Sequence, residues 1–234
     1  ETAPSLGVRL ITGTGLDRSL PPTTLRLGTT RGTNALLERR CATVAFFTTA
    51  GFGDLLRIGT QQRPDIFAFP VVLEPPIHDR SFEVDERVAA DGQVLQPLDH
   101  QQVRRLGMDA IAAGCTSASV ALLHAWTNDA HERDVEAILR DCGFEHVSRS
   151  SQLSPTIRIV PRAQAAVVDA AIEPIVGSFL GRVRGASRGH PGAYGILSRW
   201  LKKGSKSEKR RKIAQKGARK RCSSLPGTAS ALEE

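Results

Sequence analysis

The stretch from residue 117 to residue 143, SASVALLHAWTNDAHERDVEAILRDCG, contains a strand signal followed at once by a helix signal. Residues 117–124 form a near-continuous apolar run, which is typical of a strand covered on both faces. Asn128 and Asp129 can cap the helix that follows, and Gly143 can end it. Four apolar residues share one face of this helix: Val135, Ile138, Leu139 and Cys142. A buried strand joined to an amphipathic helix predicts one unit of an α/β fold.

The same alternation of strand and helix extends from about residue 23 to residue 181. The periodicity predicts further strands at 23–27, 43–49, 146–150 and 156–160, and further helices at 34–40, 51–58, 99–114 and 163–180. Asp91-Gly92 predicts a hairpin between 81–89 and 93–97, and Asp99 with Gln102 predicts a capping pair. We therefore expect a mostly parallel sheet with helices on both faces.

Charge divides this chain of 234 residues at about residue 181. Residues 1–180 hold 17 Arg, no Lys and 21 acidic residues, whereas residues 181–234 hold 15 basic and 3 acidic residues. We expect one folded domain over 1–181, incomplete at both ends, and a disordered basic tail over 182–234. Basic clusters at 202–203, 209–212 and 219–221 resemble nuclear-targeting or nucleic-acid-binding segments, although an accidental tail explains them as well.

Other features indicate the cellular setting. The four cysteines form no CxxC pair, which favours reduced thiols. No secretory leader is visible, so we expect a cytoplasmic protein. No apolar run approaches the roughly 20 residues of a membrane helix, so we expect no membrane partner.

Residues 25–40, LRLGTTRGTNALLERR, place small and hydroxyl residues between a strand and a helix. Small residues let a backbone approach a ligand closely, and the positive end of a helix dipole favours an anion. One interpretation is a loop that touches a phosphate or a substrate carboxylate. The alternative is an ordinary strand–helix turn capped by Thr30 or Thr33.

The sequence resembles the hydantoinase/5-oxoprolinase family, with the nearest likeness to bacterial-type 5-oxoprolinases. Six segments occur in the family's order over roughly residues 8–181: LRLGTTRGTNALLERR, VAFFTTAGFGDLLRIGTQQRPDIFAF, FEVDERVAADGQVLQPLD, ALLHAWTNDAHE, FEHVSRSSQLSPTIRIVPR and VVDAAIEP. The resemblance implies a partial actin/hexokinase-like (ribonuclease H-like) domain. It also implies ATP and Mg²⁺ as cofactors and a small cyclic amide as substrate, either 5-oxoproline opened to glutamate or a hydantoin. An oligomer and a second hydantoinase-type subunit or domain are further implications.

Two phosphate loops of the family are absent from the sequence. The family's Gly-Gly-Thr loop would precede residue 1, and its Gly-Pro-Ala-Gly-Gly stretch would follow the last helix, where the chain becomes basic. We therefore expect that the chain alone does not turn over ATP. The alternative function is a non-enzymatic adaptor whose basic tail binds nucleic acid or an acidic partner.

The resemblance also assigns candidate ligand-binding residues. The loop positions that match the family pattern are Gly28, Thr29, Thr30, Thr33 and Asn34. Arg63 can clamp a carboxylate, or it can pair with Asp65 and tether its own loop. Asp85 and Glu86 can bind a cation, or they can lie on a solvated face of the hairpin.

A second group of candidates surrounds the strand end at residues 121–124. Asn128, His131 and Glu132 match an Asn-Pro-x-His-Glu turn of the family, with Asp129 in place of the proline. Because ligands bind at the carboxyl ends of strands in open α/β sheets, His131 with Glu132 is the candidate acid–base pair. The alternative is helix capping plus surface charge. Two basic residues further on, Arg158 and Arg162, can attract an anionic substrate.

Overall fold

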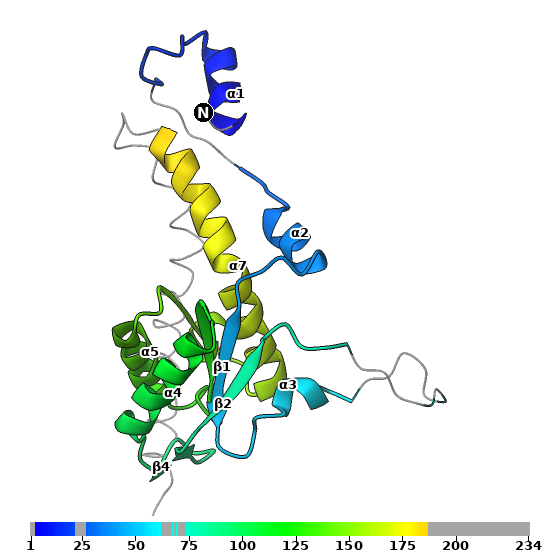
Figure 1. Cartoon of the computed structure of the whole chain (residues 1–234), viewed down its shortest axis with the longest axis vertical. Helices are drawn as coiled ribbons and strands as arrows, with labels where there is room; N and C mark the ends of the chain where they lie inside the picture. The colour runs from blue at the N-terminus through cyan, green and yellow to red at the C-terminus, as the bar shows by residue number, and fades with distance from the viewer. Residues whose placement is uncertain (1–2, 22–26, 62–66, 68, 70–73, 187–234) are drawn as a thin grey trace, which may run out of the picture.

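The computed structural model describes residues 3–21, 27–61, 67, 69 and 74–186. Four parallel strands form the main sheet in the order β2-β1-β5-β6: β2 (Arg80–Val84), β1 (Val44–Thr49), β5 (Ser117–Ala121) and β6 (His146–Arg149). Helices separate the strands along the chain, and Figure 1 shows them around the sheet. The predicted α/β class with a mostly parallel sheet is confirmed.

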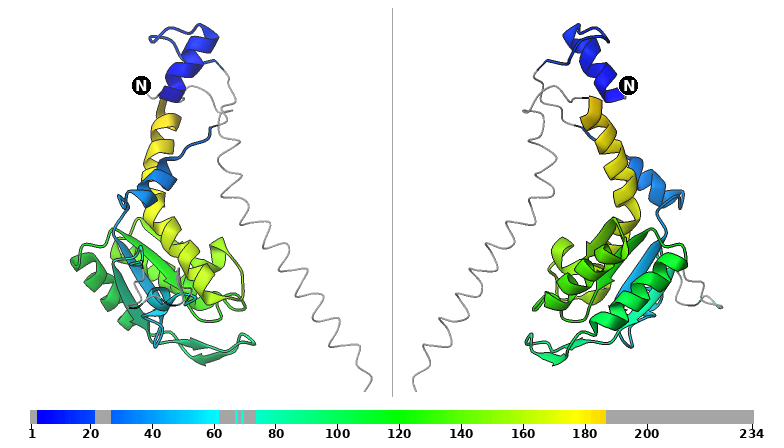
Figure 2. Two further views of the ribbon diagram at one scale, coloured as in Figure 1. Left: turned by 90° about the vertical axis from the view of Figure 1, so that its right-hand side faces the viewer. Right: turned by 60° about the vertical axis from the view of Figure 1, so that its left-hand side comes forward.

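Neighbouring phenylalanines of β1 show how the sheet is covered on both faces. Phe47 packs into a core formed with helices α4 (His100–Ala112) and α5 (Ala130–Cys142). Phe46 packs instead against Ala163 and Val167 of helix α7 (Ile159–Ala186). Successive side chains of a strand point to opposite faces, so α7 and the α4–α5 pair lie on opposite sides, as Figure 2 shows. The continuous apolar strands follow from this double cover.

Helix α2 (Arg31–Leu37) lies beside the half of α7 that extends beyond the sheet, and helix α1 (Ala3–Thr12) lies near the far end of that half (Figure 1). A Cβ atom at Gly32 would lie 3.5 Å from side-chain atoms of Ile172 and Val176, so glycine lets α2 approach α7 closely. The guanidinium of Arg31 lies 4.7 Å from the centre of the Phe179 ring. Since α2 precedes β1, it lies at the end of the sheet where the strands begin. Two short helices complete the chain order: α3 (Leu55–Ile58) and α6 (Ser150–Leu153).

The predicted hairpin forms, but with shorter strands than the periodicity predicts. Strands β3 (Arg87–Val88) and β4 (Val94–Gln96) pair antiparallel, with Gly92 at a φ of 92° in the turn. Residues 81–84 belong to β2 and pair with β1 in the parallel sheet instead. The single predicted strand over 81–89 is therefore wrong, because its two halves join different sheets.

The strand predicted at 156–160 is also wrong. Ile159 and Val160 lie in the first turn of α7, and residues 154–158 connect α6 to that helix. Their β-branched side chains produce a strand-like signal, but the described chain gives this segment no neighbouring strand to pair with. Helix α7 includes Pro174 and continues to Ala186, past the predicted boundary at 181. The predictions for residues 23–26 and for the tail from 187 onward fall outside the described residues.

Helix α7 is long and apolar enough to cross a membrane by length and composition, over Ile159–Val183 with a mean hydropathy of 1.3. One such helix is weak evidence for a membrane span, because the core helices of globular proteins pass the same test of length and hydropathy. In this structure the sheet covers part of the apolar surface of α7, where Ala163, Val167 and Ala170 are buried. Asp169 of the same helix accepts a hydrogen bond from the hydroxyl of Ser148 in β6, at 2.8 Å.

A close approach between α4 and α5 yields a test of this packing. A Cβ at Gly107 would lie 3.0 Å from Cδ2 of Leu139 and 3.1 Å from Sγ of Cys142. We expect Gly107→Val to lower the free energy of unfolding by about 1–3 kcal/mol, because overpacking forces neighbours off their preferred rotamers. Denaturant unfolding measures the change. Gly177→Val, at an exposed helical position, is the control and should not destabilise; equal losses would contradict the packing described.

Candidate functional site

All four parallel strands end at one side of the main sheet, called here its carboxyl end. The strand order is β2-β1-β5-β6. The chain therefore continues from β1 to β2 on one side of β1, and it later crosses to β5 on the other side of β1. The carboxyl ends of β1 and β5 therefore flank the point where the strand order reverses. In open α/β sheets, ligands bind in the crevice at this point.

A buried carboxylate connects three segments at the carboxyl end. Glu86, only 1% exposed, follows β2 and accepts a hydrogen bond from Nδ1 of His131 in the first turn of α5, at 2.7 Å. Its other oxygen accepts a short hydrogen bond from the hydroxyl of Thr49, the last residue of β1. The same hydroxyl oxygen accepts from the Leu123 N–H at 2.9 Å. Because an ionised carboxylate only accepts, the proton lies on Nδ1, and Nε2 of His131 is the nitrogen left as an acceptor.

Glu132, next to His131, points to different partners and is fully buried. Its carboxylate accepts hydrogen bonds from the Leu122 N–H at 3.0 Å, the Ser150 hydroxyl at 2.5 Å and the Ser151 N–H at 2.9 Å. These contacts join the end of β5 to the end of β6. The alternative of helix capping plus surface charge is wrong for this pair, because both side chains are buried and bonded across the sheet.

Arg162 places a guanidinium in the same region. The side chain is fully buried, and Nη2 donates to the Leu122 carbonyl at 2.7 Å. Nε and Nη1 have no acceptor among the described residues, and the buried hydroxyl of Ser151 also has no partner there. Burial lowers the pKa of Arg162, and the nearby Glu132 carboxylate acts in the opposite direction. Arg158, the other predicted basic residue, is exposed just before α7.

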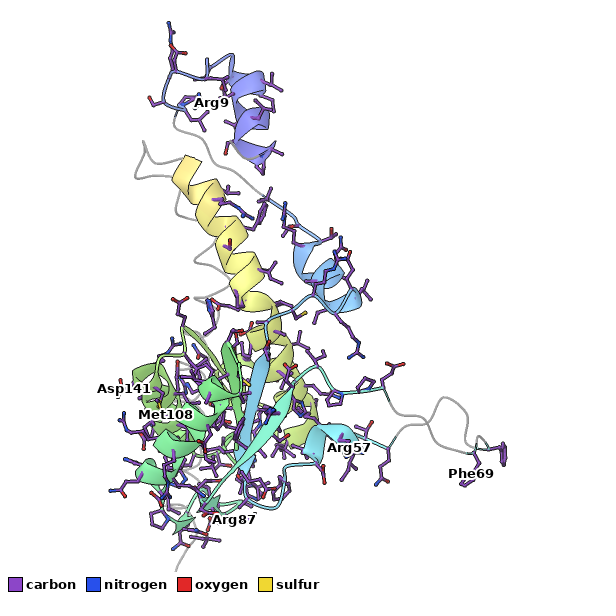
Figure 3. All side chains as sticks on the ribbon, in the orientation of Figure 1. Arg9, Arg57, Phe69, Arg87, Met108 and Asp141 are labelled. Atoms are coloured by element: carbon purple, nitrogen blue, oxygen red, sulfur yellow. The ribbon has the colours of Figure 1, made fainter. Side chains whose placement is uncertain are left out.

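Asn128 holds the loop after β5 against the hairpin. Its amide donates to the Gly92 carbonyl at 3.0 Å, and its Oδ1 accepts from the Ala130 N–H at 3.1 Å. The predicted cap of α5 therefore comes from Asn128. Figure 3 shows Arg87 at this end of the molecule, where it donates to the Ala50 carbonyl at 3.3 Å. Loops after β1 and β5 and the hairpin thus lie together around the reversal point.

Asp85 and Glu86, the predicted cation pair, have separate partners. Oδ2 of Asp85 accepts from the side-chain Nε2 of Gln102 at 2.7 Å, and the backbone N–H of Asp85 donates to the side-chain Oε1 of Gln102 at 2.9 Å. Gln102 therefore does not complete the predicted capping pair, although Asp99 caps α4 through the N–H groups of residues 101 and 102. Within the described ranges, no group of three or more His, Cys, Asp or Glu side chains could hold a metal ion.

The predicted loop at residues 28–34 lies at the opposite end of the sheet. Helix α2 precedes Val44, the first residue of β1, and the five steps from Val44 to Thr49 correspond to about 16 Å at 3.3 Å per residue. Thr29 accepts from the Arg31 N–H at 3.3 Å, and Thr30 precedes α2 without a side-chain capping bond. Gly28, Thr33 and Asn34 are exposed or at the surface of α2. The structure therefore does not bring this loop and His131 together, and Arg63 lies outside the described residues.

Sequence reasoning missed three residues of the site. Thr49 is the last residue of β1, and Ser150 and Ser151 are the first two residues after β6. A polar residue at the end of a predicted parallel strand was the signal that could have identified them, since the carboxyl ends of parallel strands lie on one side of a sheet. Without the strand order, however, nothing in the sequence pairs Thr49 with Glu86, which lies 37 positions away.

The chain is similar to proteins that act on cyclic amides and ketones. Residues 1–143 match the model of the hydantoinase/oxoprolinase N-terminal region. The chain is 36% identical to 5-oxoprolinase 1 of Arabidopsis thaliana over 77% of its length and 16% of that protein. It is 37% identical to 5-oxoprolinase of Saccharomyces cerevisiae over 68% of its length and 14% of that protein. The gamma subunit of acetophenone carboxylase from Aromatoleum aromaticum is 28% identical over 73% of this chain and 26% of that subunit.

Two solved structures share the fold. Nucleotide-free acetone carboxylase has a TM-score of 0.67 at 20% identity, over 82% of this chain and 31% of that one. The ATP-dependent caprolactamase of Pseudomonas jessenii has a TM-score of 0.66 at 21% identity, over 83% of this chain and 30% of that one. These neighbours show the predicted hydantoinase-like, actin/hexokinase-type fold. This chain spans about one sixth of the length of the two 5-oxoprolinases.

The buried hydrogen bonds of Glu132 predict that replacing its carboxylate by an amide destabilises the fold. We expect Glu132→Gln to lower the free energy of unfolding by about 2 kcal/mol, because the amide nitrogen faces a donor and the charge beside Arg162 is lost. Denaturant unfolding gives the value. Asp134→Asn, on an exposed position of the same helix, should change it by less than about 0.5 kcal/mol. Equal effects of the two variants would show that Glu132 does not join the strand ends as described.

Proposed function

We propose that this chain, which belongs to the hydantoinase/oxoprolinase family, forms part of an enzyme that opens small cyclic amides in an ATP-dependent reaction. The relatives named 5-oxoprolinase support 5-oxoproline as the substrate, and a hydantoin is the other member of this class. The observation that carries the proposal is the buried His131–Glu86 pair at the point where the strand order reverses. Such a pair provides a general base in the place where open α/β sheets bind ligands.

The proposed role of the pair is proton transfer during ring opening. A water molecule attacks the carbonyl carbon of the ring amide, and its proton moves to Nε2 of His131. The ring C–N bond then breaks, and the imidazolium returns the proton to the departing nitrogen. Glu86 holds the imidazole with Nδ1–H toward its carboxylate and stabilises the imidazolium, while Thr49 fixes Glu86. Glu86 is in this proposal a positioning residue.

The described residues do not assemble a Mg²⁺ site, since Asp85 and Glu86 already bind Gln102, Thr49 and His131. Of the predicted loop at residues 28–34, residues 28–30 are exposed and residues 31–34 belong to α2, a helix of seven residues, which is too short to provide an anion site by itself. We therefore assign no step to ATP or Mg²⁺ through these residues. We propose that both act in the complete enzyme, and that a second hydantoinase-type subunit or domain contributes to it; a relative that is itself a subunit supports the latter.

The activity test compares this chain alone with the chain extended at both ends by the flanking segments of a complete relative. We expect ATP-dependent release of glutamate from 5-oxoproline by the extended protein and none by the chain alone. In the extended protein, His131→Asn should lower kcat by about 10²–10⁴-fold, because it removes the general base. His100→Asn, on an exposed residue of α4, is the matched control and should leave kcat unchanged.

Glu86→Gln separates a positioning role from a structural one. The variant should lower kcat with little change in KM. A residue that only supported the fold would instead lower the free energy of unfolding without a selective loss of kcat. If the extended protein releases no glutamate while the chain binds polyanions tightly, the adaptor alternative replaces the enzymatic proposal.

A further inference from the structure

Arg149, the last residue of β6, connects that strand to two carboxylates of the α5 segment. Its Nε donates a short hydrogen bond to Oε2 of Glu136, and its Nη1 lies 3.8 Å from Oδ2 of Asp129, the residue before α5. Two nitrogens of one planar guanidinium thus reach two separate carboxylates, whereas a lysine offers a single nitrogen. These side chains are mostly buried, with exposed fractions of 14% for Arg149, 19% for Glu136 and 22% for Asp129.

Glu136 also joins α5 to the other end of β6. Its Oε1 accepts hydrogen bonds from Nε and Nη2 of Arg140, at 3.1 and 3.0 Å. Nη1 of Arg140 donates in turn to the backbone carbonyl of Glu145, directly before β6, at 3.0 Å. One carboxylate therefore ties α5 to both ends of the strand. Because the Arg149–Glu136 pair is largely removed from water, salt screens it less than an exposed pair.

The same part of α5 carries His131. Asp129 lies two positions before this residue, and Glu136 lies five positions after it. Nδ1 of His131 donates to Glu86, which follows β2 at the opposite end of the strand order from β6. The imidazole thus meets a partner from one side of the sheet while its helix is tied to the other side. Where Nε2 of His131 lies at the reversal point consequently depends on how Arg149 holds α5.

We propose that Arg149 is a positioning residue for His131 and acts through Asp129 and Glu136. This inference rests on the proposed function, in which His131 is the general base, and it deepens that function by adding a residue that contacts neither the imidazole nor the reacting atoms. A catalytic group has to be held within about 0.5 Å of its productive place by the residues around it. Since a misplacement of about 1 Å can cost about 100-fold in rate, an ion pair that fixes the helix contributes to kcat.

A different arginine–carboxylate pair on α5 provides the matched control. Nη2 of Arg104 in α4 lies 3.8 Å from Oδ2 of Asp141, in the last turn of α5. The two side chains are exposed by 57% and 69%, and exposed pairs contribute little to stability. Loss of this pair should leave the first turn of α5, with His131, in place.

The first test measures how fast the Nδ1 proton of His131 exchanges with water, by nuclear magnetic resonance on the full chain. Arg149→Met should accelerate this exchange about 10-fold relative to the backbone N–H of Val120 in β5, because the bond to Glu86 opens more often. Arg149→Lys keeps the charge and should give a smaller increase, and Arg104→Met should give none. Equal acceleration at His131 and Val120 would show a general loss of stability and would overturn the proposal.

The second test uses the extended protein and separates kcat from KM. Arg149→Met should lower kcat by about 10- to 100-fold with KM unchanged. If this variant does not fold, Glu136→Gln replaces it in both tests, because it removes the charge that Arg149 pairs with. Unchanged exchange of the His131 proton would overturn the positioning role and leave the proposed function standing. Selectively accelerated exchange, in a protein whose extended form releases no glutamate, would support the positioning of His131 and contradict the proposed function.

Discussion

Two buried carboxylates, those of Glu86 and Glu132, constrain the whole carboxyl end of the sheet. A carboxylate removed from water is unstable unless donors replace its hydration, and here five donors do so. They come from β1, α5, the loop after β5 and the turn after β6. The loops cannot move apart without leaving a charge unpaired. The geometry of the candidate site is therefore set by the requirement to satisfy these two groups.

The parallel sheet supplies the second constraint, because all its strands end on the same side and so the candidate site residues lie at that side alone. Thr49 ends β1 and joins the site, while α2 at the start of the same strand packs on α7. A ligand that contacts His131 is consequently separated from the loop at residues 28–34 by the length of β1. Both regions matter for one active site only if the ligand, or a segment outside the described residues, extends along the strand.

Much of the fold could be predicted from the sequence, since periodicity identified β1, β5, β6, α4, α5 and the hairpin turn. The sequence-based predictions of secondary structure were wrong where tertiary contacts, rather than local propensity, decide which element a segment forms. Residues 81–84 and 87–88 look alike in sequence, yet the first group joins β1 and the second joins β4. Residues 156–160 have strand propensity, but Ile159 begins α7. The candidate site shows the same division: His131, Glu132 and Arg162 were identified, whereas Thr49, Ser150 and Ser151 required the strand order.

The different surroundings of His131 and Glu132 explain why a motif alone could not assign their roles. Successive residues of a helix project about 100° apart, so two neighbours in the first turn of α5 face different loops. One side chain meets the carboxylate that follows β2, and the other meets the ends of β5 and β6. Both oxygens of Glu132 accept hydrogen bonds that hold the loops together, whereas Nε2 of His131 has no hydrogen-bond partner in the described part of the chain. A shift of α5 by one residue would place one of the two side chains in the surroundings of the other. The N-terminal position of α5, held by the hydrogen bonds of Asn128, therefore decides which residue is available for chemistry.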